Sequence, residues 1–244
     1  MKHPRLRDSK KLQTNEPYPL GELPNELIVR IGGHLAHLMY IGRKDISGSD
    51  WGDAFADAVG GTHLDSPVGI ADVVLGKMAW SMKTVKHSNP FMAQSVRLIS
   101  GRCSPDYSYG ITDPHEDIQQ TGRAVLGIWN ERINIAQDSY NPVRTAVLLR
   151  SDDLLNYCLF EEENHRYSTN DYAWEVNSNG NLIGKHVLSG ETCFTWQPHG
   201  SQFTIHARVP KHAVKFTLQR PPLLTKETIL NSIGFDESWV KIFR

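Results

Sequence analysis

The sequence predicts an α/β fold of the α+β kind, with an α/β core and an appended β-rich region in the C-terminal half. Three observations predict this fold. Apolar residues recur at helical spacing from Pro24 onward, β-rich runs replace that pattern from residue 70, and strand-like runs dominate beyond residue 156. The length of 244 residues suits one domain with an elaborated edge, or two closely joined halves.

Two helices are expected before residue 62. Pro24 suits the first turn of a helix. Its apolar residues then follow at three- and four-residue steps: Leu27, Ile28, Ile31, Leu35, Leu38 and Met39. A second, shorter helix is expected after Ser49-Asp50, with Ser49 as its N-cap, and Gly60-Gly61 should end it.

A hairpin, a helix and a strand are expected next. The β-rich runs 70–75 and 79–85 are separated by Gly76-Lys77, which is typical of a two-residue hairpin turn. Asp113-Pro114 predicts the start of a longer helix over 114–138. The almost continuous apolar run 145–149 predicts a central strand covered on both faces.

The second half is predicted to be a sheet. Asn179-Gly180 is its clearest hairpin turn. Strands are expected at 157–161, 171–177, 181–188, 192–197, 202–207 and 212–218. A short helix over 225–233 should follow. We therefore expect one domain over 20–244, divided into a core (20–155) and a β-rich subregion (156–244).

Composition excludes several classes of protein. There are 26 Lys and Arg against 27 Asp and Glu, so a polycation of the histone kind is excluded. The 3 cysteines are widely spaced, which argues against a disulfide scaffold and a thiolate zinc site. The sequence contains no apolar run long enough to span a bilayer, and its first residues lack the apolar core of a secretory signal. We expect a soluble cytoplasmic protein that does not associate with a membrane.

Residues 1–19 are basic and polar, and we expect a flexible N-terminal arm. This arm is either a solvated tail or a segment that touches a polyanion.

The hairpin carries the residues that point to a chemistry. Asp72 begins its first strand, and Ser81 and Lys83 lie on its second strand, two residues apart and therefore on one face. A lysine among apolar neighbours inside a strand is costly unless it has a partner or faces a cleft. Asp72 and Lys83 are therefore the leading candidates for a functional site.

This arrangement resembles the PD-(D/E)xK nuclease superfamily, which includes most type II restriction endonucleases and the mismatch-repair nickase MutH. The family pattern is an aspartate, a hairpin, then an acidic residue, any residue and lysine; here it reads Asp72, Ser81, Met82, Lys83, followed by Thr84. The segment 52–61 resembles the helix that carries a further acidic residue. Over roughly residues 24–150 the resemblance implies the αβββαβ core of that superfamily, a mixed central sheet flanked by helices.

The resemblance implies hydrolysis of phosphodiester bonds with Mg²⁺, for which Mn²⁺ should substitute. Asp72 would be the principal metal ligand, and Lys83 would stabilise developing charge. Ser81 departs from the pattern, because it stands where the second carboxylate is expected and a hydroxyl is a weak Mg²⁺ ligand. The candidates to replace that carboxylate are Asp53, Asp57, Glu26 and Asp65.

The β-rich subregion is the candidate for DNA recognition. The turn around 196–202 carries side chains that can contact base edges, although a solvated hairpin loop would look the same. The candidate DNA-binding residues are Gln197, His199, Ser201, Gln202, Arg208, Lys86, Arg97 and Arg102. The charge run Glu161-Glu162-Glu163 predicts a solvated loop that faces away from DNA.

These features predict a type II restriction enzyme that cuts double-stranded DNA at specific sequences. A cognate DNA methyltransferase would then be its genetic partner. A homodimer would suit palindromic DNA by symmetry, and a monomer also remains open. The alternatives are a MutH-like nicking nuclease, a non-catalytic nucleic-acid-binding or protein-binding module with a nuclease-like core, and a carbohydrate-binding β-sheet protein.

Overall fold

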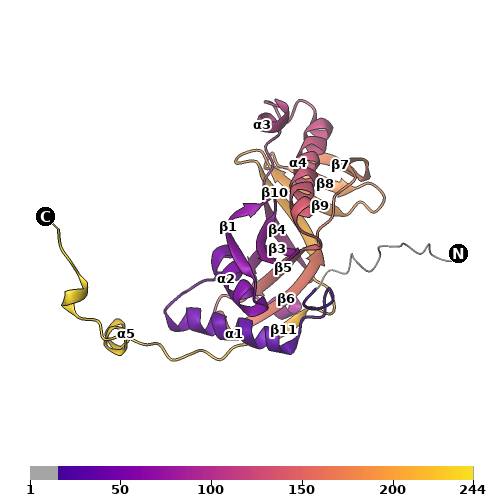
Figure 1. Cartoon of the computed structure of the whole chain (residues 1–244). Helices are drawn as coiled ribbons and strands as arrows, with labels where there is room; N and C mark the ends of the chain where they lie inside the picture. The colour runs from indigo at the N-terminus through magenta and orange to yellow at the C-terminus, as the bar shows by residue number, and fades with distance from the viewer. Residues whose placement is uncertain (1–15, 244) are drawn as a thin grey trace, which may run out of the picture.

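A computed structural model of the protein describes residues 16–243. Over these residues the chain forms five α-helices and two β-sheets, one mixed and one antiparallel (Figure 1). The helices are α1 (Asn25–Tyr40), α2 (Gly48–Val59), α3 (Pro105–Tyr109), α4 (Ile118–Ser139) and α5 (Lys226–Ser232). This architecture confirms the predicted α+β class.

The larger sheet has six strands in the spatial order β1-β2-β3-β5-β6-β11. Its strands are β1 (Thr62–Val68), β2 (Ala71–Leu75), β3 (Met78–Lys86), β5 (Val143–Arg150), β6 (Asn156–Glu163) and β11 (Val214–Thr217). The first three form an antiparallel meander. β5 then pairs parallel to β3, after a crossover that contains α4.

The smaller sheet has five antiparallel strands in the order β4-β10-β9-β8-β7. Its strands are β4 (Ser95–Arg102), β7 (Tyr172–Val176), β8 (Leu182–His186), β9 (Thr192–Gln197) and β10 (Gln202–Arg208). The sheets do not divide at residue 155, where we expected the core to end. β4 from the first half joins the smaller sheet, and β6 and β11 from the second half complete the larger one.

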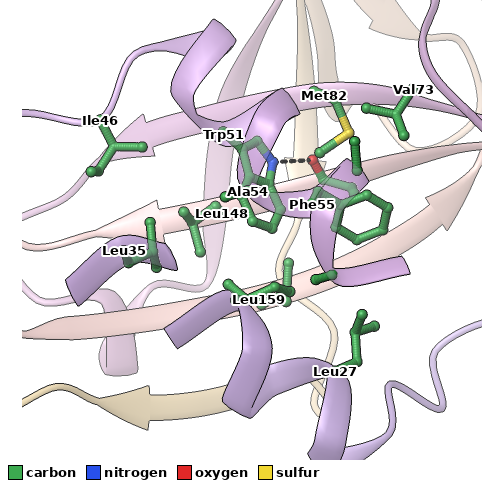
Figure 2. Packing of buried hydrophobic residues seen from close by; sticks show 14 of the residues in the cluster. Leu27, Leu35, Ile46, Trp51, Ala54, Phe55, Val73, Met82, Leu148 and Leu159 are labelled. Carbon is green, nitrogen blue, oxygen red and sulfur yellow. Dashed lines mark hydrogen bonds between the residues drawn. The ribbon is translucent and has the colours of Figure 1, made fainter. Parts of the chain in front are cut away.

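Helices α1 and α2 cover one face of the larger sheet. Trp51 and Phe55 of α2 are fully buried and pack edge-on, and Phe55 packs in turn against Trp80 of β3. The Trp51 indole N–H donates a 3.1 Å hydrogen bond to the carbonyl of Ala146 in β5 (Figure 2). This bond holds α2 over the centre of the sheet while satisfying a buried donor.

Helix α4 and the smaller sheet cover the opposite face. Val125, Trp129 and Ile133 of α4 belong to one apolar cluster with Phe194 and Phe203 of the smaller sheet. In a further cluster, Val96 and Leu98 of β4 meet Val147, Leu149 and Phe160 of the larger sheet. β5 therefore lies between two apolar layers, and all its residues are buried, as the sequence predicts for a central strand.

The sequence predicted most of the elements but misplaced two helix starts. Ser47, rather than Ser49, caps α2, because its hydroxyl accepts from the Asp50 N–H in a capping box. Asp117, rather than Asp113, caps α4 through the Gln120 N–H. The strands β1 and β4 were not expected.

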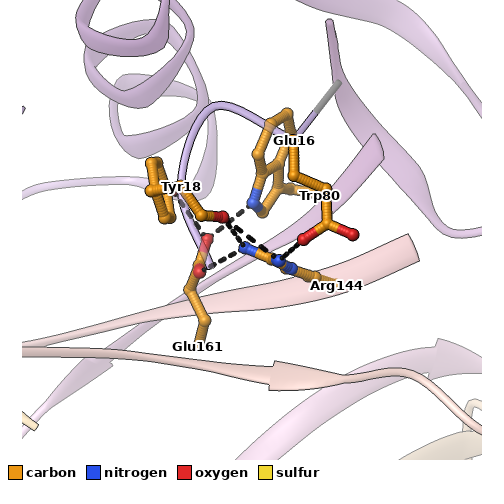
Figure 3. A network of polar contacts seen from close by, with 5 residues as sticks. All are labelled: Glu16, Tyr18, Trp80, Arg144 and Glu161. Atoms are coloured by element: carbon orange, nitrogen blue, oxygen red, sulfur yellow. Dashed lines mark hydrogen bonds and ion pairs between the residues drawn. The ribbon is translucent and has the colours of Figure 1, made fainter. Parts of the chain in front are cut away.

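The end of the predicted N-terminal arm is fixed to the core. Residues 1–15 lie outside the described residues, but Tyr18 is buried, and its hydroxyl donates a 2.9 Å hydrogen bond to Glu161. Arg144 donates to the same carboxylate, to Glu16 and to the Tyr18 carbonyl, and Trp80 donates its indole N–H to Glu161 (Figure 3). Three residues from distant parts of the chain, Tyr18, Trp80 and Arg144, therefore donate to one buried carboxylate.

The prediction of a solvated loop at Glu161-Glu162-Glu163 was wrong, because these residues end β6. Glu161 faces the side of the sheet covered by α1 and α2, where Arg144 neutralises it. Alternation along the strand places Glu162 on the opposite face.

Leu218 and Arg220, just beyond β11, still contact the core and the Asp153 carbonyl, whereas α5 and the residues after it lie away from both sheets (Figure 1). α5 and the following 3-10 turn, Glu237–Trp239, contain no buried residue.

Candidate functional site

The β2–β3 hairpin brings Asp72 and Ser81 together. Gly76 takes a φ of +57° in the turn, which a two-residue hairpin requires at its first position. The register Val73↔Trp80 then places Asp72 opposite Ser81. Asp72 Oδ2 accepts a 2.7 Å hydrogen bond from the backbone N–H of Met82 and a 3.3 Å bond from the Ser81 hydroxyl.

Lys83 lies two residues after Ser81, on the same face of β3. Its side chain is partly buried, and burial lowers the pKa of its ammonium group below the usual value. The nearby Arg132 lowers that pKa further, whereas the Asp72 carboxylate opposes the shift. Asp72 and Lys83 are therefore brought together as the sequence predicted.

A cavity of about 530 Å³ opens beside this pair. Its lining residues come from β1, β2, β3 and the beginning of α2: Gly48, Ser49, Asp53, His63, Leu64, Asp65, Pro67, Asp72, Met82 and Lys83. The pairing of β1 with β2 is irregular between His63 and Val68. Because β1 is not regularly paired with β2 over these residues, it does not close the space beside Asp72.

Asp53 is the predicted replacement carboxylate that the fold brings to this cavity from α2. Its Oδ1 lies 2.7 Å from Nδ1 of His63. The His63 ring sits so close to α2 that a Cβ on Gly52 would lie 2.5 Å from its Nε2. Glycine at position 52 therefore permits the contact that orients Asp53.

The other predicted carboxylates are placed differently. Asp65 lines the same cavity from β1. Asp57 faces His34 at 3.9 Å, and Glu26 is exposed on α1; neither lines this cavity. Among residues 16–243, no group of three or more His, Cys, Asp and Glu side chains is close enough to hold a metal ion.

Three of the predicted DNA-binding residues form a row at one end of the smaller sheet. Gln202 of β10 pairs in register with Arg102 of β4 on one side and with Gln197 of β9 on the other. The turn between β9 and β10 carries His199, which is exposed, and Ser201. These five residues therefore form one polar surface, which we call the turn surface.

The remaining predicted DNA-binding residues lie elsewhere. Arg97 pairs in register with His206, and Arg208 with Ser95, so both lie toward the other end of the sheet. Arg208 makes a bidentate ion pair with Glu191. Lys86, at the end of β3, pairs with Asp152 at 2.7 Å.

A second cavity, of about 410 Å³, lies between the two sheets, and Lys83 lines it as well. Glu162, which the sequence assigned to a solvated loop, lines this cavity together with Asn164, which the sequence did not indicate. The sequence signal that could have indicated Glu162 is the alternation of side chains between the two faces of β6. This alternation places Glu162 and the buried Glu161 on opposite faces of the sheet.

No protein-family model matches the chain, and no curated protein or solved structure matches it either. Within the described part of the chain, none of the helices combines the length and apolar character that crossing a membrane requires.

Proposed function

We propose that the protein is a Mg²⁺-dependent endonuclease of the PD-(D/E)xK kind that cuts double-stranded DNA at specific sequences, as type II restriction enzymes do. The observation that carries the proposal is the placement of Asp72 and Lys83 on adjacent strands beside one open cavity. The order α2, β1, β2, β3, α4, β5 supports it, although β4 and α3 are inserted before α4, because the resemblance implies an αβββαβ core and β5 is parallel to β3.

Asp53 is the residue that would replace the carboxylate missing at Ser81. Mg²⁺ is commonly held by one or two carboxylates together with water and substrate phosphate. Among the described residues, Asp72 uses only Oδ2 in hydrogen bonds and Asp53 uses only Oδ1. Each carboxylate therefore keeps one oxygen for a cation, and carboxylate oxygen is the ligand that Mg²⁺ and Mn²⁺ prefer.

The chain's own residues then have distinct tasks. When bound, Mg²⁺ would neutralise the phosphate and lower the pKa of an attacking water. Lys83 would stabilise the charge that develops on the phosphate. The lowered pKa of Lys83 also favours its neutral amine, and in that form it would take a proton from the attacking water instead of stabilising charge. His63 positions Asp53.

Sequence recognition is assigned to the turn surface. Glutamine pairs with adenine through two hydrogen bonds, and arginine pairs with guanine in the same way. Gln197, Gln202 and Arg102 supply these groups side by side. Two copies of the chain would present them to a palindromic site, and a cognate methyltransferase would protect host DNA.

Ser81 favours one other candidate, a DNA-binding module that retains the nuclease-like core without cleavage. Its hydroxyl is engaged with Asp72 and is almost fully buried, at 2 % exposure. If Asp53 does not complete the metal site, the chain would bind DNA and leave it intact.

The test is incubation of the purified full chain with unmethylated supercoiled plasmid and Mg²⁺, Mn²⁺ or EDTA. The proposal predicts discrete linear bands that EDTA abolishes, and loss of cleavage in Asp72→Asn and Lys83→Ala. Asp106→Asn, on exposed α3, and Lys77→Ala, in the hairpin turn, are the matched controls and should cut normally. Nicked circles alone would indicate a MutH-like nickase.

Persistent cleavage by both Asp72→Asn and Lys83→Ala would refute the site. Binding without cleavage, with affinity falling steeply as salt rises, would identify the DNA-binding module instead.

A further inference from the structure

The last residues of the described chain form an arm that packs on neither sheet. This C-terminal arm, residues 219–243, follows Leu218, which packs against the apolar cluster of α1, α2 and the larger sheet. Over the described residues, none of the buried apolar clusters includes a residue beyond Leu218. Figure 1 shows α5 and the C-terminal residues apart from the body of the protein. The side chains of the arm are therefore available to a partner.

The arm carries a large amount of exposed apolar surface. Seven of its large apolar side chains are between 40 % and 89 % exposed, among them Phe235, Trp239 and Phe243. Aromatic side chains bury about 150–250 Å² each and aliphatic ones less, so covering these seven would remove on the order of 500 Å² per arm from water. Two arms would reach the roughly 1,000 Å² that a specific protein–protein interface requires.

The arm is ordered locally although it lacks a core of its own. Thr225 caps α5, and Asp236 caps the following 3-10 turn, each by accepting a backbone N–H bond with its side chain. The rings of Phe235 and Trp239 pack edge-on, with centroids 5.6 Å apart. A seven-residue helix gains too little from its own hydrogen bonds to persist in water, so α5 needs a surface to pack on.

The start of the arm directs it away from the chain that carries it. Arg220 donates a 2.9 Å hydrogen bond to the carbonyl of Asp153, which holds the base of the arm to the body. Pro221-Pro222 then favours an extended, semi-rigid chain of about 3.1 Å per residue. Because α5 adds about 1.5 Å per residue, residues 219–232 span on the order of 30 Å. This reach suits contact with a second copy of the chain better than folding back.

A groove lies at the point where the arm leaves the body. Its volume is about 400 Å³, and it is formed by the end of α1, the β5–β6 turn and the base of the arm. Met39 and Leu154 give it apolar surface from the body, and Pro221 and Leu223 line it from the arm. In a two-fold symmetric contact the bases of two arms face each other, so each arm passes the groove of the other copy. We call this cavity the arm groove.

The arm groove and the arm carry complementary charges. Lys44 lines the groove, is exposed, and makes no ion pair with the residues that the structure describes. The two carboxylates of the lining, Asp152 and Asp153, already have partners within the chain. On the arm, Glu237 is exposed and lies in the same 3-10 turn as Trp239. Insertion of Trp239 into the groove would therefore bring an acidic residue to an unpaired ammonium group.

We propose that the C-terminal arm of one copy docks in the arm groove of a second copy, and the reverse, so that the protein is a dimer held by exchanged arms. Phe235 and Trp239 are the apolar anchor, in keeping with the aromatic residues that dominate interfaces, and Glu237 pairs with Lys44 of the other copy. The inference goes beyond the proposed nuclease and does not rest on it, because neither DNA nor metal takes part in the contact.

The oligomeric state of the full chain tests the arm. Sedimentation equilibrium at micromolar concentrations, without DNA or metal, should give twice the 27.5 kDa of one chain. Trp239→Glu places a charge in the anchor and should raise the dissociation constant of the dimer about tenfold or more. Leu188→Glu makes a comparable change at a side chain that is 91 % exposed between β8 and β9, and should leave the dimer unchanged. A wild-type chain that stays monomeric, or a dimer that tolerates Trp239→Glu, would overturn the proposal.

A charge exchange tests the groove. Lys44→Glu sets two carboxylates against each other and should weaken the dimer several-fold, and adding Glu237→Lys should restore it. Lys77→Glu, at an exposed residue of the β2–β3 turn that does not line the groove, should have no effect. Thermal unfolding of each variant checks its fold. Failure of the exchange to restore the dimer would overturn the assignment of the groove.

Discussion

The backbone N–H of Met82 donates a 2.7 Å hydrogen bond to the side chain of Asp72 across the β2–β3 hairpin. This bond comes from the strand that carries Lys83, so the same backbone that positions the lysine also orients the carboxylate. The Ser81 hydroxyl adds a second, longer bond to the same oxygen. Asp72 Oδ2 is therefore fixed by the hairpin, and Oδ1 makes no hydrogen bond with the residues that the structure describes.

Asp72→Asn should abolish cleavage and leave the fold intact. Asparagine keeps an oxygen that accepts from Met82, but it removes the negative charge that would hold a cation. We expect DNA cleavage in Mg²⁺ to fall by about 10²-fold or more. Initial cleavage rates across a Mg²⁺ titration check this, with circular dichroism as the control for folding. A variant that cuts at the wild-type rate would contradict the role of Asp72.

Gly52→Ala should disturb the orientation of Asp53. The added methyl group would lie 2.5 Å from His63 Nε2, so the ring must move and its contact with Asp53 is lost. Overpacking of this kind costs about 1–3 kcal/mol, so we expect lower stability to urea and a weaker response of cleavage to Mg²⁺. Gly33→Ala, on α1, is the control, because its methyl group would meet no atom within 4 Å and the residue does not line the cavity beside Asp72. Equal behaviour of the two variants would contradict the prediction.

Much of the fold was predictable because its signals are local. The Gly76-Lys77 turn defines the hairpin, and the uninterrupted apolar run defines β5. β4 also carried a signal, since its buried residues alternate with exposed ones, but its two arginines obscured it. Membership of the sheets was not predictable, because the pairing of β11 with β6 and of β4 with β10 joins distant segments without a local pattern.

In the candidate site too, contacts within one local element were predictable and contacts between distant segments were not. Asp72 and Lys83 belong to one hairpin, so their proximity followed from the turn. Choosing between Asp53 and Asp57 required the packing of α2 against β1, which spacing along a helix does not reveal. Glu162 reaches the second cavity, between the two sheets, only because β6 joins the larger sheet beside β5.

Stability should depend on pH through Lys83. The pKa of its ammonium is lowered in the folded protein, so between that lowered value and its usual value of 10.5 the unfolded chain binds more protons than the folded chain. The free energy of unfolding must then increase with pH across this interval. Lys83→Met removes the group, so urea unfolding at increasing pH below 10.5 should show the wild type gaining stability relative to the variant. A difference that stays constant with pH would contradict this.

Arg144→Met should destabilise the protein strongly. The side chains of Arg144 and Glu161 are 2 % and 0 % exposed, so removal of the guanidinium leaves a buried carboxylate without its counter-ion. We expect a loss of about 3–5 kcal/mol in the free energy of unfolding. Adding Glu161→Gln should restore part of this loss, because the amide carries no charge and its oxygen still accepts from Tyr18 and Trp80. Urea unfolding of the single and double variants measures both effects, and additive losses would contradict the pairing.

Lys83 borders both cavities, so a ligand in either of them could contact its ammonium group. A ligand that drew this group toward the cavity between the sheets would withdraw it from the Asp72 side, and a phosphate beside Asp72 would do the reverse. By thermodynamic linkage, a ligand in the first cavity would change the affinity of a ligand in the second by the same factor as the second ligand changes the affinity of the first. Through the single side chain of Lys83, binding in one cavity would then affect binding in the other without movement of either sheet.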